Sequence, residues 1–157
     1  MGTEIERKFL LANDDWRGLG EGKLYCQGYI CSGGQGTVRI RTIGDSGFLT
    51  IKGPTRGLVR AEYEYPIPVA DAREMLANLC RGPLVEKIRY TIDFAGSIWE
   101  IDEFKNENDG LVVAEIELEQ PQQQFVMPPW VGTEVSNDPR YRNSSLVINP
   151  YNSWDKK

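Results

Sequence analysis

Charged residues recur two positions apart along this chain, and each group carries a single sign. The groups are Glu4/Glu6, Arg39/Arg41, Glu62/Glu64, Lys87/Arg89, Glu100/Asp102 and Glu115/Glu117/Glu119, with Lys8 and Lys52 as single cations. Six cations can neutralise a compact polyanion, because guanidinium forks match phosphate oxygens. Clustered carboxylates are the ligands that Mg²⁺ or Mn²⁺ prefers, and a divalent cation would keep them from repelling that anion. The pattern favours a site for a phosphate chain and a metal.

The composition restricts the chemistry further. The chain has no histidine, which excludes Ser-His-Asp and Cys-His catalysis and most zinc sites. Its three cysteines show no paired metal-ligand spacing, so we interpret them as reduced packing residues. The net charge of −5 argues against a broad nucleic-acid surface, although a local cationic pocket remains compatible with it. Metal-assisted hydrolysis of a phosphate bond needs neither histidine nor a covalent nucleophile.

The elements that position these charges are mainly strands, because apolar and charged residues alternate with period two. Eight strands are predicted, at 4–11, 25–32, 37–43, 48–52, 60–67, 85–94, 97–104 and 111–119. Short glycine-rich links predict antiparallel hairpins. Apolar residues at helical spacing predict a helix over 72–80 capped by Asp71, and a short final helix is expected over 141–147. Residues 120–127 are expected to form a short helix or an ordered loop.

Alternation alone leaves two arrangements open. In an ordinary antiparallel sheet the charged face would be wet and the apolar face buried. Same-sign charges on one strand face lie about 7 Å apart and gain nothing from each other, which favours ligand binding instead. Eight strands can also close into a barrel with a polar lumen and an apolar exterior covered by helices. We therefore weigh a wet sheet against a charged tunnel.

The ordered series of motifs resembles the CYTH superfamily, the triphosphate tunnel metalloenzymes. The N-terminal signature Glu-x-Glu-x-Lys of that family stands here as Glu4-Ile5-Glu6-Arg7-Lys8. The series continues through Gln27-Gly28-Tyr29, Arg39-Ile40-Arg41, Lys52, Glu62-Tyr63-Glu64, Lys87-Ile88-Arg89, Asp102, Glu115-Ile116-Glu117 and Arg140-Tyr141-Arg142-Asn143. The resemblance implies a mainly β fold, an eight-stranded antiparallel closed barrel with a few helices packed outside.

The resemblance also implies roles. The residues expected to hold the triphosphate are Lys8, Arg39, Arg41, Lys52, Lys87 and Arg89, and those expected to bind the metal are Glu4, Glu6, Asp102, Glu115 and Glu117. Glu62 and Glu64 would orient water or a second metal. Tyr29 would approach Lys8 to form a proton-handling pair, as suggested for some small bacterial members. For Glu100 and Glu119 a rim or solvent charge is an equally good interpretation.

Three functions are compatible with this site. The leading hypothesis is Mg²⁺- or Mn²⁺-dependent hydrolysis of inorganic tripolyphosphate to pyrophosphate and phosphate. The resemblance also allows a class IV-type adenylate cyclase or a nucleoside or thiamine triphosphatase. A polyphosphate-binding module without catalysis is the third.

The chain as a whole is expected to form one domain over residues 1–157, with 149–157 as a loosely held tail. No apolar run approaches the roughly 20 residues of a membrane helix, so we expect a cytoplasmic protein without a membrane partner. The expected ligand is a small molecule that carries a triphosphate, and no nucleic-acid polymer is expected. A homodimer is one possible assembly.

Overall fold

The computed structural model describes residues 2–33 and 35–154, which form a mainly β structure. Its strands are β1 (Thr3–Leu11), β2 (Gly22–Cys31), β3 (Thr37–Ile43), β4 (Ser46–Lys52), β5 (Val59–Ile67), β6 (Val85–Phe94), β7 (Ser97–Phe104), β8 (Val112–Glu117) and β9 (Val131–Glu134). The helices are α1 (Val69–Asn78) and α2 (Asn143–Ile148), with short 3₁₀ turns η1 (Asn106–Asn108), η2 (Pro139–Tyr141) and η3 (Tyr151–Ser153).

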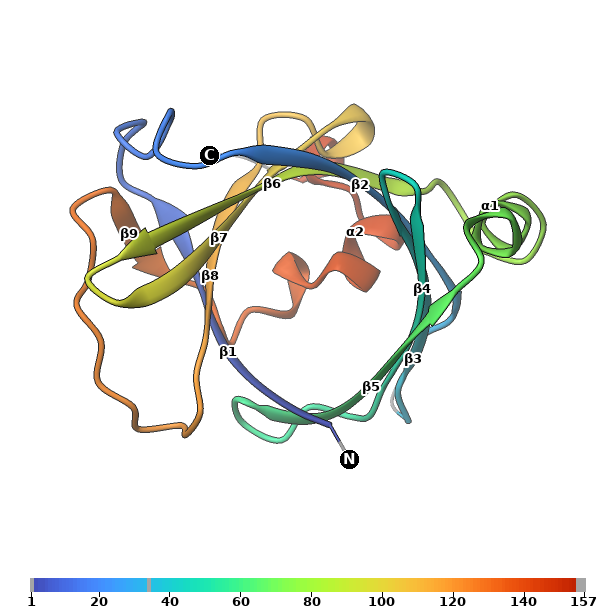
Figure 1. Ribbon diagram of the computed structural model, residues 1–157, viewed down its shortest axis with the longest axis horizontal. Helices are drawn as coiled ribbons and strands as arrows, with labels where there is room; N and C mark the ends of the chain where they lie inside the picture. The colour runs from blue at the N-terminus through green and yellow to red at the C-terminus, as the bar shows by residue number, and fades with distance from the viewer. Residues whose placement is uncertain (1, 34, 155–157) are drawn as a thin grey trace.

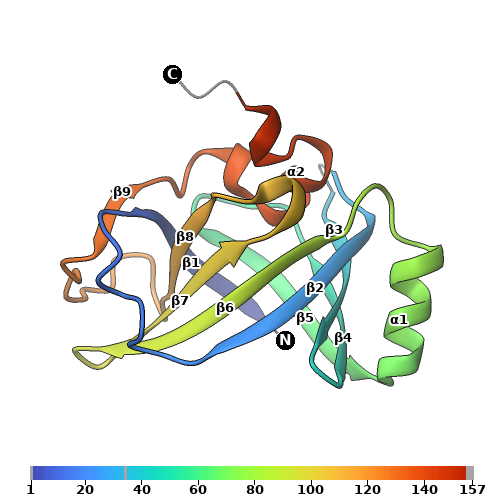
Figure 2. The same ribbon diagram turned by 90° about the horizontal axis from the view of Figure 1, so that it is seen from above.

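The sheet closes on itself through β1. Its strand order is β5-β4-β3-β2-β6-β7-β8-β1-β9, and β1 also pairs with β5, so eight strands form a ring. Every pairing is antiparallel. Figure 1 looks along the axis of this barrel, and Figure 2 shows it from the side. The predicted eight-stranded barrel is confirmed, and β9 is an additional strand that the sequence pattern did not predict.

The hairpin between β6 and β7 shows why consecutive strands pair. Ala95 and Gly96 both have positive φ, 52° and 84°. Two central residues with positive φ define the turn whose twist matches that of the flanking strands. The register that follows places Arg89 opposite Asp102, which brings a predicted phosphate ligand and a predicted metal ligand together.

Helix α1 packs on the outer wall of the barrel, against β3 and β4. The contact is close, because a Cβ on Gly47 would lie 2.8 Å from the Cβ of Ala72. The helix begins at Val69, three residues earlier than predicted, and its N-cap is Pro68 rather than Asp71. Asp71 lies instead in the first turn, where a negative charge interacts favourably with the helix dipole.

Apolar clusters lie outside the lumen and across one of its ends. One outer cluster contains Phe9, Trp16, Trp99 and Trp130. Another cluster closes one end of the barrel, where Leu146 and Val147 of α2 pack on residues from the strands that include Tyr29, Val85, Phe104 and Val113. Figure 2 shows α2 lying across this end of the barrel. The lumen is therefore closed on the side of α2.

The remaining segments are ordered connections. Residues 118–130 form a loop without regular structure, and Phe125 in this loop packs on the outer cluster. Of the two alternatives predicted for residues 120–127, a short helix or an ordered loop, the structure shows the loop. Of the predicted tail, residues 155–157 lie outside the described residues. Trp154 packs on Tyr141 and Tyr151, with ring centroids 5.1 Å away in both cases. None of the described helices is long and apolar enough to cross a membrane.

Candidate active site

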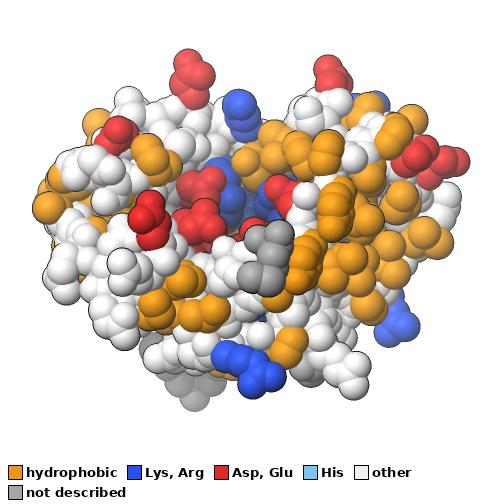
Figure 3. All heavy atoms as spheres, turned by 60° about the horizontal axis from the view of Figure 1, so that its bottom comes forward, with side chains coloured by type: hydrophobic (Ala, Val, Ile, Leu, Met, Phe, Trp, Pro, Cys, Tyr) orange, Lys and Arg blue, Asp and Glu red, His pale blue; other side chains and the backbone are white. Residues whose placement is uncertain are grey.

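The lumen forms one polar cavity of about 270 Å³. Figure 3 shows acidic and basic side chains gathered in a hollow on the surface of the molecule. All six predicted phosphate ligands line the cavity, together with Tyr29, Glu62, Glu64 and four of the five predicted metal ligands, Glu4, Glu6, Glu115 and Glu117. The fifth, Asp102, is fully buried beneath Lys87 and Arg89, which line the cavity and donate to its carboxylate. The charged face of the strands is thus the inner face.

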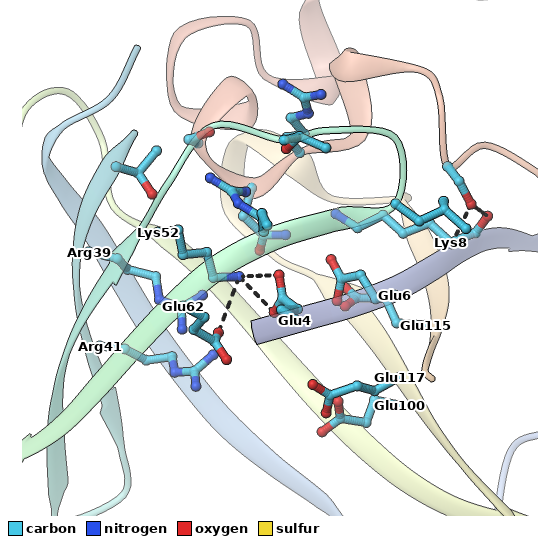
Figure 4. A pocket seen from close by; sticks show the side chains of 18 of the residues that line it. Glu4, Glu6, Lys8, Arg39, Arg41, Lys52, Glu62, Glu100, Glu115 and Glu117 are labelled. Carbon is cyan, nitrogen blue, oxygen red and sulfur yellow. Dashed lines mark hydrogen bonds and ion pairs between the residues drawn. The ribbon is translucent and has the colours of Figure 1, made fainter. Parts of the chain in front are cut away.

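Lys52 joins two carboxylates from neighbouring strands, as the dashed lines of Figure 4 show. Its Nζ donates to Glu4 Oε1 at 3.1 Å and Oε2 at 3.0 Å, and it lies 3.5 Å from Glu62 Oε2. Burial alone would raise the pKa of Glu4, but Lys52 outweighs burial and lowers it. Glu62 has a raised pKa, because it is partly buried and lies beside Glu4.

Arg39 and Arg41 share a single carboxylate. The Nη2 atoms of Arg39 and Arg41 donate to Glu64 Oε1, at 3.5 and 3.2 Å, and the Thr50 hydroxyl donates to the same oxygen at 2.8 Å. Both guanidinium groups are buried, yet their Nε atoms have no hydrogen-bond partner among the described residues. Buried donors are nearly always paired in folded proteins, so two unpaired N–H groups beside a cavity favour an anionic ligand there.

Asp102 is engaged by two cations. Its Oδ1 accepts from Arg89 Nε at 2.7 Å, and its Oδ2 accepts from Arg89 Nη2 at 2.8 Å and from Lys87 Nζ at 2.9 Å. Burial lowers the pKa of Lys87 to about 7, although Asp102 counteracts this. That Asp102 binds a metal stays a prediction, and its contacts favour positioning Lys87 and Arg89.

Lys8 lies near the closed end of the lumen. Its Nζ donates to the backbone oxygen of Tyr141 at 3.1 Å, and no carboxylate lies within ion-pair distance among the described residues. Burial alone would lower the pKa of Lys8, but Glu115, Glu6 and Asp102 together raise it. Lys8 and the predicted partner Tyr29 make no hydrogen bond to each other among the described residues, and the Tyr29 hydroxyl accepts one from Gln27 Nε2 at 3.0 Å.

Glu6 and Glu117 are the carboxylates with too little positive charge around them. Burial and the neighbouring carboxylates Glu115 and Glu4 raise the pKa of Glu6 well above its ordinary value. Burial, Glu4 and Glu100 likewise raise the pKa of Glu117, and Figure 4 shows Glu117 beside Glu100.

These carboxylates supply the oxygen ligands that divalent cations prefer, and they lack counter-charge. The donor set therefore fits a divalent cation. In the described chain, however, no three acidic or cysteine side chains are already gathered closely enough to enclose one. These carboxylates would have to move closer together when a divalent cation binds.

The cavity is also lined by residues to which the sequence analysis gave no role, among them Tyr25, Arg60, Arg142 and Asn143, the last two of which belong to the family series. Arg60 lies on the same strand face as Glu62 and Glu64, so the two-residue spacing could have found it. Arg142 and Asn143 precede or begin the short helix α2, where no strand periodicity marks them. Asn143 Oδ1 accepts from Lys87 Nζ at 2.9 Å and from Gln27 Nε2 at 3.2 Å. Residues 139–148, the closing segment of the lumen, therefore help to hold Lys87 in place.

The fold and the lumen define a class of protein, the closed antiparallel tunnels lined by cations and carboxylates. The family model described as the CYTH domain matches residues 2–147. The chain belongs to the CYTH domain family.

Two curated relatives support this membership. The chain is 51% identical over 154 residues to an inorganic triphosphatase of Acetivibrio thermocellus, covering 98% of this chain and 99% of the relative. It is 38% identical over 154 residues to an inorganic triphosphatase of Nitrosomonas europaea, covering 93% and 97%.

Solved structures show the same fold. A crystal structure of an inorganic triphosphatase is similar with a TM-score of 0.68 and 33% identity, over 92% of this chain and 97% of that chain. A candidate adenylyl cyclase from Hippeastrum with a dominant triphosphatase activity has a TM-score of 0.59 and 16% identity, over 77% of this chain and 81% of that one. Because the second structure is only 16% identical, its similarity to this chain supports the fold and not the activity.

Proposed function

We propose that this chain is an inorganic triphosphatase, which hydrolyses tripolyphosphate to pyrophosphate and phosphate with the help of a divalent cation. The observation that carries the proposal is the lumen itself, where eight cations and eight carboxylates line one cavity and two buried arginine donors lack partners among the described residues. The names of the two curated relatives support the same activity.

The size of the cavity supports an unsubstituted triphosphate. At about 270 Å³ it lies below the roughly 300–1,000 Å³ typical of pockets for drug-sized ligands. The end near α2 is closed by an apolar cluster, which leaves little room for a nucleoside there. Inorganic triphosphate therefore suits the lumen better than ATP or thiamine triphosphate.

The cations of the lumen have different roles in binding the phosphate chain. Arg39 and Arg41 supply guanidinium groups from the wall of the cavity, and Lys8 adds a charge that no carboxylate among the described residues pairs directly. Lys87 and Arg89 hold further oxygens from positions fixed by Asp102. Such preorganised donors stabilise the charge that develops in the transition state without reorganising during the reaction.

Glu4, Glu6, Glu115 and Glu117 would hold the divalent cation, which is Mg²⁺ or Mn²⁺. When bound, this cation polarises the phosphoryl group and neutralises part of its charge. Glu62 and Glu64 orient the attacking water. Tyr29 lines the same lumen as Lys8, and the two form a proton-handling pair in this proposal.

A substrate panel tests the proposal. Phosphate release from tripolyphosphate, ATP and thiamine triphosphate is measured with Mg²⁺ and with Mn²⁺, and ATP products are separated by chromatography. We expect the highest kcat/KM for tripolyphosphate, with pyrophosphate and phosphate as products. Faster turnover of ATP, or formation of cyclic AMP, would contradict the proposal. Tight tripolyphosphate binding without turnover of any substrate would instead identify a binding module.

The cytoplasmic location and the homodimer belong to the proposal as well. Both stay predictions, and size-exclusion chromatography with light scattering measures the second directly. A mass twice that of the 17.8 kDa chain would support the dimer.

A further inference from the structure

Tyr25 of β2 lies among three of the cations assigned to phosphate binding. The centroid of its ring is 5.0 Å from Cζ of Arg41, 5.2 Å from Cζ of Arg89 and 5.9 Å from Nζ of Lys87. β2 lies between β3 and β6 in the barrel, so the ring stands between the strand that carries Arg41 and the strand that carries the other two. Tyr25 also lines the cavity.

These three cations repel one another, and carboxylates compensate them only in part. Arg89 lies beside Asp102, Glu100 and Glu115, but Lys87 shares Asp102 with Arg89, and Arg41 shares Glu64 with Arg39. Burial and the nearby Arg39 and Arg89 lower the pKa of Arg41 to about 10. Arg41 shares Glu64 with a second arginine, and of the three cations it lies nearest to the ring of Tyr25.

An aromatic ring is suited to this task. Its electron-rich face attracts cations within about 6 Å, most strongly where water is excluded. A carboxylate in the same place would attract the cations too, but it would cancel their charge and repel the phosphate chain. A ring leaves the positive charge available to an incoming anion.

We propose that Tyr25 is a positioning residue, whose ring holds Arg41, Arg89 and Lys87 together by cation–π attraction so that they bind one polyanion. The inference rests on the proposed function, since it takes these cations as the phosphate ligands. The ring itself contacts no reacting atom. The proposal assigns the effect to the ring and not to the hydroxyl, which makes no hydrogen bond among the described residues.

The first experiment compares two substitutions. Tyr25→Phe keeps the ring and retains kcat/KM for tripolyphosphate within about twofold. Tyr25→Leu removes the ring and lowers kcat/KM about tenfold, the effect of losing one desolvated cation–π contact. Equal activity of the Leu and Phe variants overturns the inference.

The second experiment separates attraction to the ring from simple packing. Phenylalanine carrying one, two or three fluorine atoms is incorporated at position 25, which weakens the negative face of the ring with little change in its shape. We expect the affinity for tripolyphosphate, measured by calorimetry in EDTA, to fall stepwise with each fluorine. An affinity that is flat across the series means that Tyr25 only fills space, and this result would overturn the inference.

Tyr90 provides the matched control. It is a partly buried tyrosine on β6 that packs on Trp16 with ring centroids 5.2 Å apart, on the outer side of the barrel. The same fluorinated series at position 90 should leave the affinity unchanged. A parallel decline at both positions would indicate a general loss of stability and count against a role of the ring in binding.

Binding and turnover are read separately so that the two proposals can fail separately. If the wild-type chain binds tripolyphosphate but releases no phosphate, the triphosphatase assignment fails, and the fluorine series still decides the role of Tyr25. If the wild-type chain binds no tripolyphosphate either in EDTA or with Mg²⁺ or Mn²⁺ present, both proposals are overturned.

Discussion

Single side chains in the lumen are held by partners that the substrate must share or displace. Lys52 is the clearest case, since it contacts both Glu4 and Glu62 and still lines the cavity. Such a cation keeps its place in the free protein and remains directed toward a ligand. The apo lumen is therefore preorganised at its cations.

Replacing Lys52 with Gln should lower kcat/KM for tripolyphosphate by about 10²–10³, the effect of removing one preorganised donor from a transition state. Steady-state phosphate release measures it. Lys105→Gln is the control, because Lys105 lies on the outside, 3.7 Å from Glu103, and should leave the rate unchanged. A Lys52 variant as active as the control would contradict the assigned role.

Glu6 gives a prediction about pH. Burial and Glu115 raise its pKa above the ordinary value of 4.5, so the folded chain binds this proton more tightly than the unfolded chain does. The stability that protonation contributes is complete below pH 4.5 and is lost as the pH rises through the raised pKa.

In EDTA at pH 8, Glu6→Gln should therefore raise Tm by about 2–4 °C, the size expected of about 1 kcal/mol in a domain of this length. At pH 4.5 the gain should vanish. Glu74→Gln on the exposed face of α1 is the control and should change Tm at neither pH. A gain of equal size at both pH values would show that the charge of Glu6 is not the cause.

The residues that could be predicted from the sequence are the charged residues spaced two apart, because that spacing places them on one face of a strand. Arg39, Arg41, Glu115 and Glu117 were found in this way, and the family resemblance gave their roles. Tyr25 was missed because an aromatic residue in a strand usually indicates packing. The engagement of Asp102 by two cations depends on the register between β6 and β7, which the spacing within one strand does not contain.

At the scale of elements, the strands were predictable and the closing segment was less so. The bounds of β3, β6 and β7 match the prediction, because each alternates without interruption up to its turn. β9 has four residues, too few for alternation to be distinguished from chance, and it pairs with the distant β1. The position of α2 across the end of the barrel depends on contacts with strands far away in the sequence.

The closing segment should contribute strongly to stability. Leu146 is 1% exposed in the cluster that closes the lumen, so Leu146→Ala should cost about 2–5 kcal/mol of unfolding free energy. Ile148→Ala is the control two residues further, because Ile148 is 79% exposed and a surface change stays within about 0.5 kcal/mol. Urea unfolding followed by tryptophan fluorescence measures both. Equal losses would show that α2 is not anchored through Leu146.

At the scale of the whole molecule, closing the sheet inverts the usual distribution of residues. The charged face of each strand turns inward, loops and α1 cover much of the apolar outer face, and α2 closes one end of the lumen. Alternation alone left a wet sheet and a charged tunnel both open, because only the pairing of β1 with β5 decides between them, and it was the family resemblance that favoured the tunnel. That the chain forms one domain over residues 1–157 stays a prediction.

The most direct test of the central claim is the rate of phosphate release from tripolyphosphate by the wild-type chain and by Arg39→Gln, in Mg²⁺ or Mn²⁺ and again after EDTA. We predict turnover by the wild type that stops with EDTA, and a rate about 10²–10³ lower for the variant, because a buried phosphate donor is lost. Circular dichroism confirms that both are folded. No phosphate release by the folded wild type with either metal, or an undiminished rate in the variant, would contradict the account.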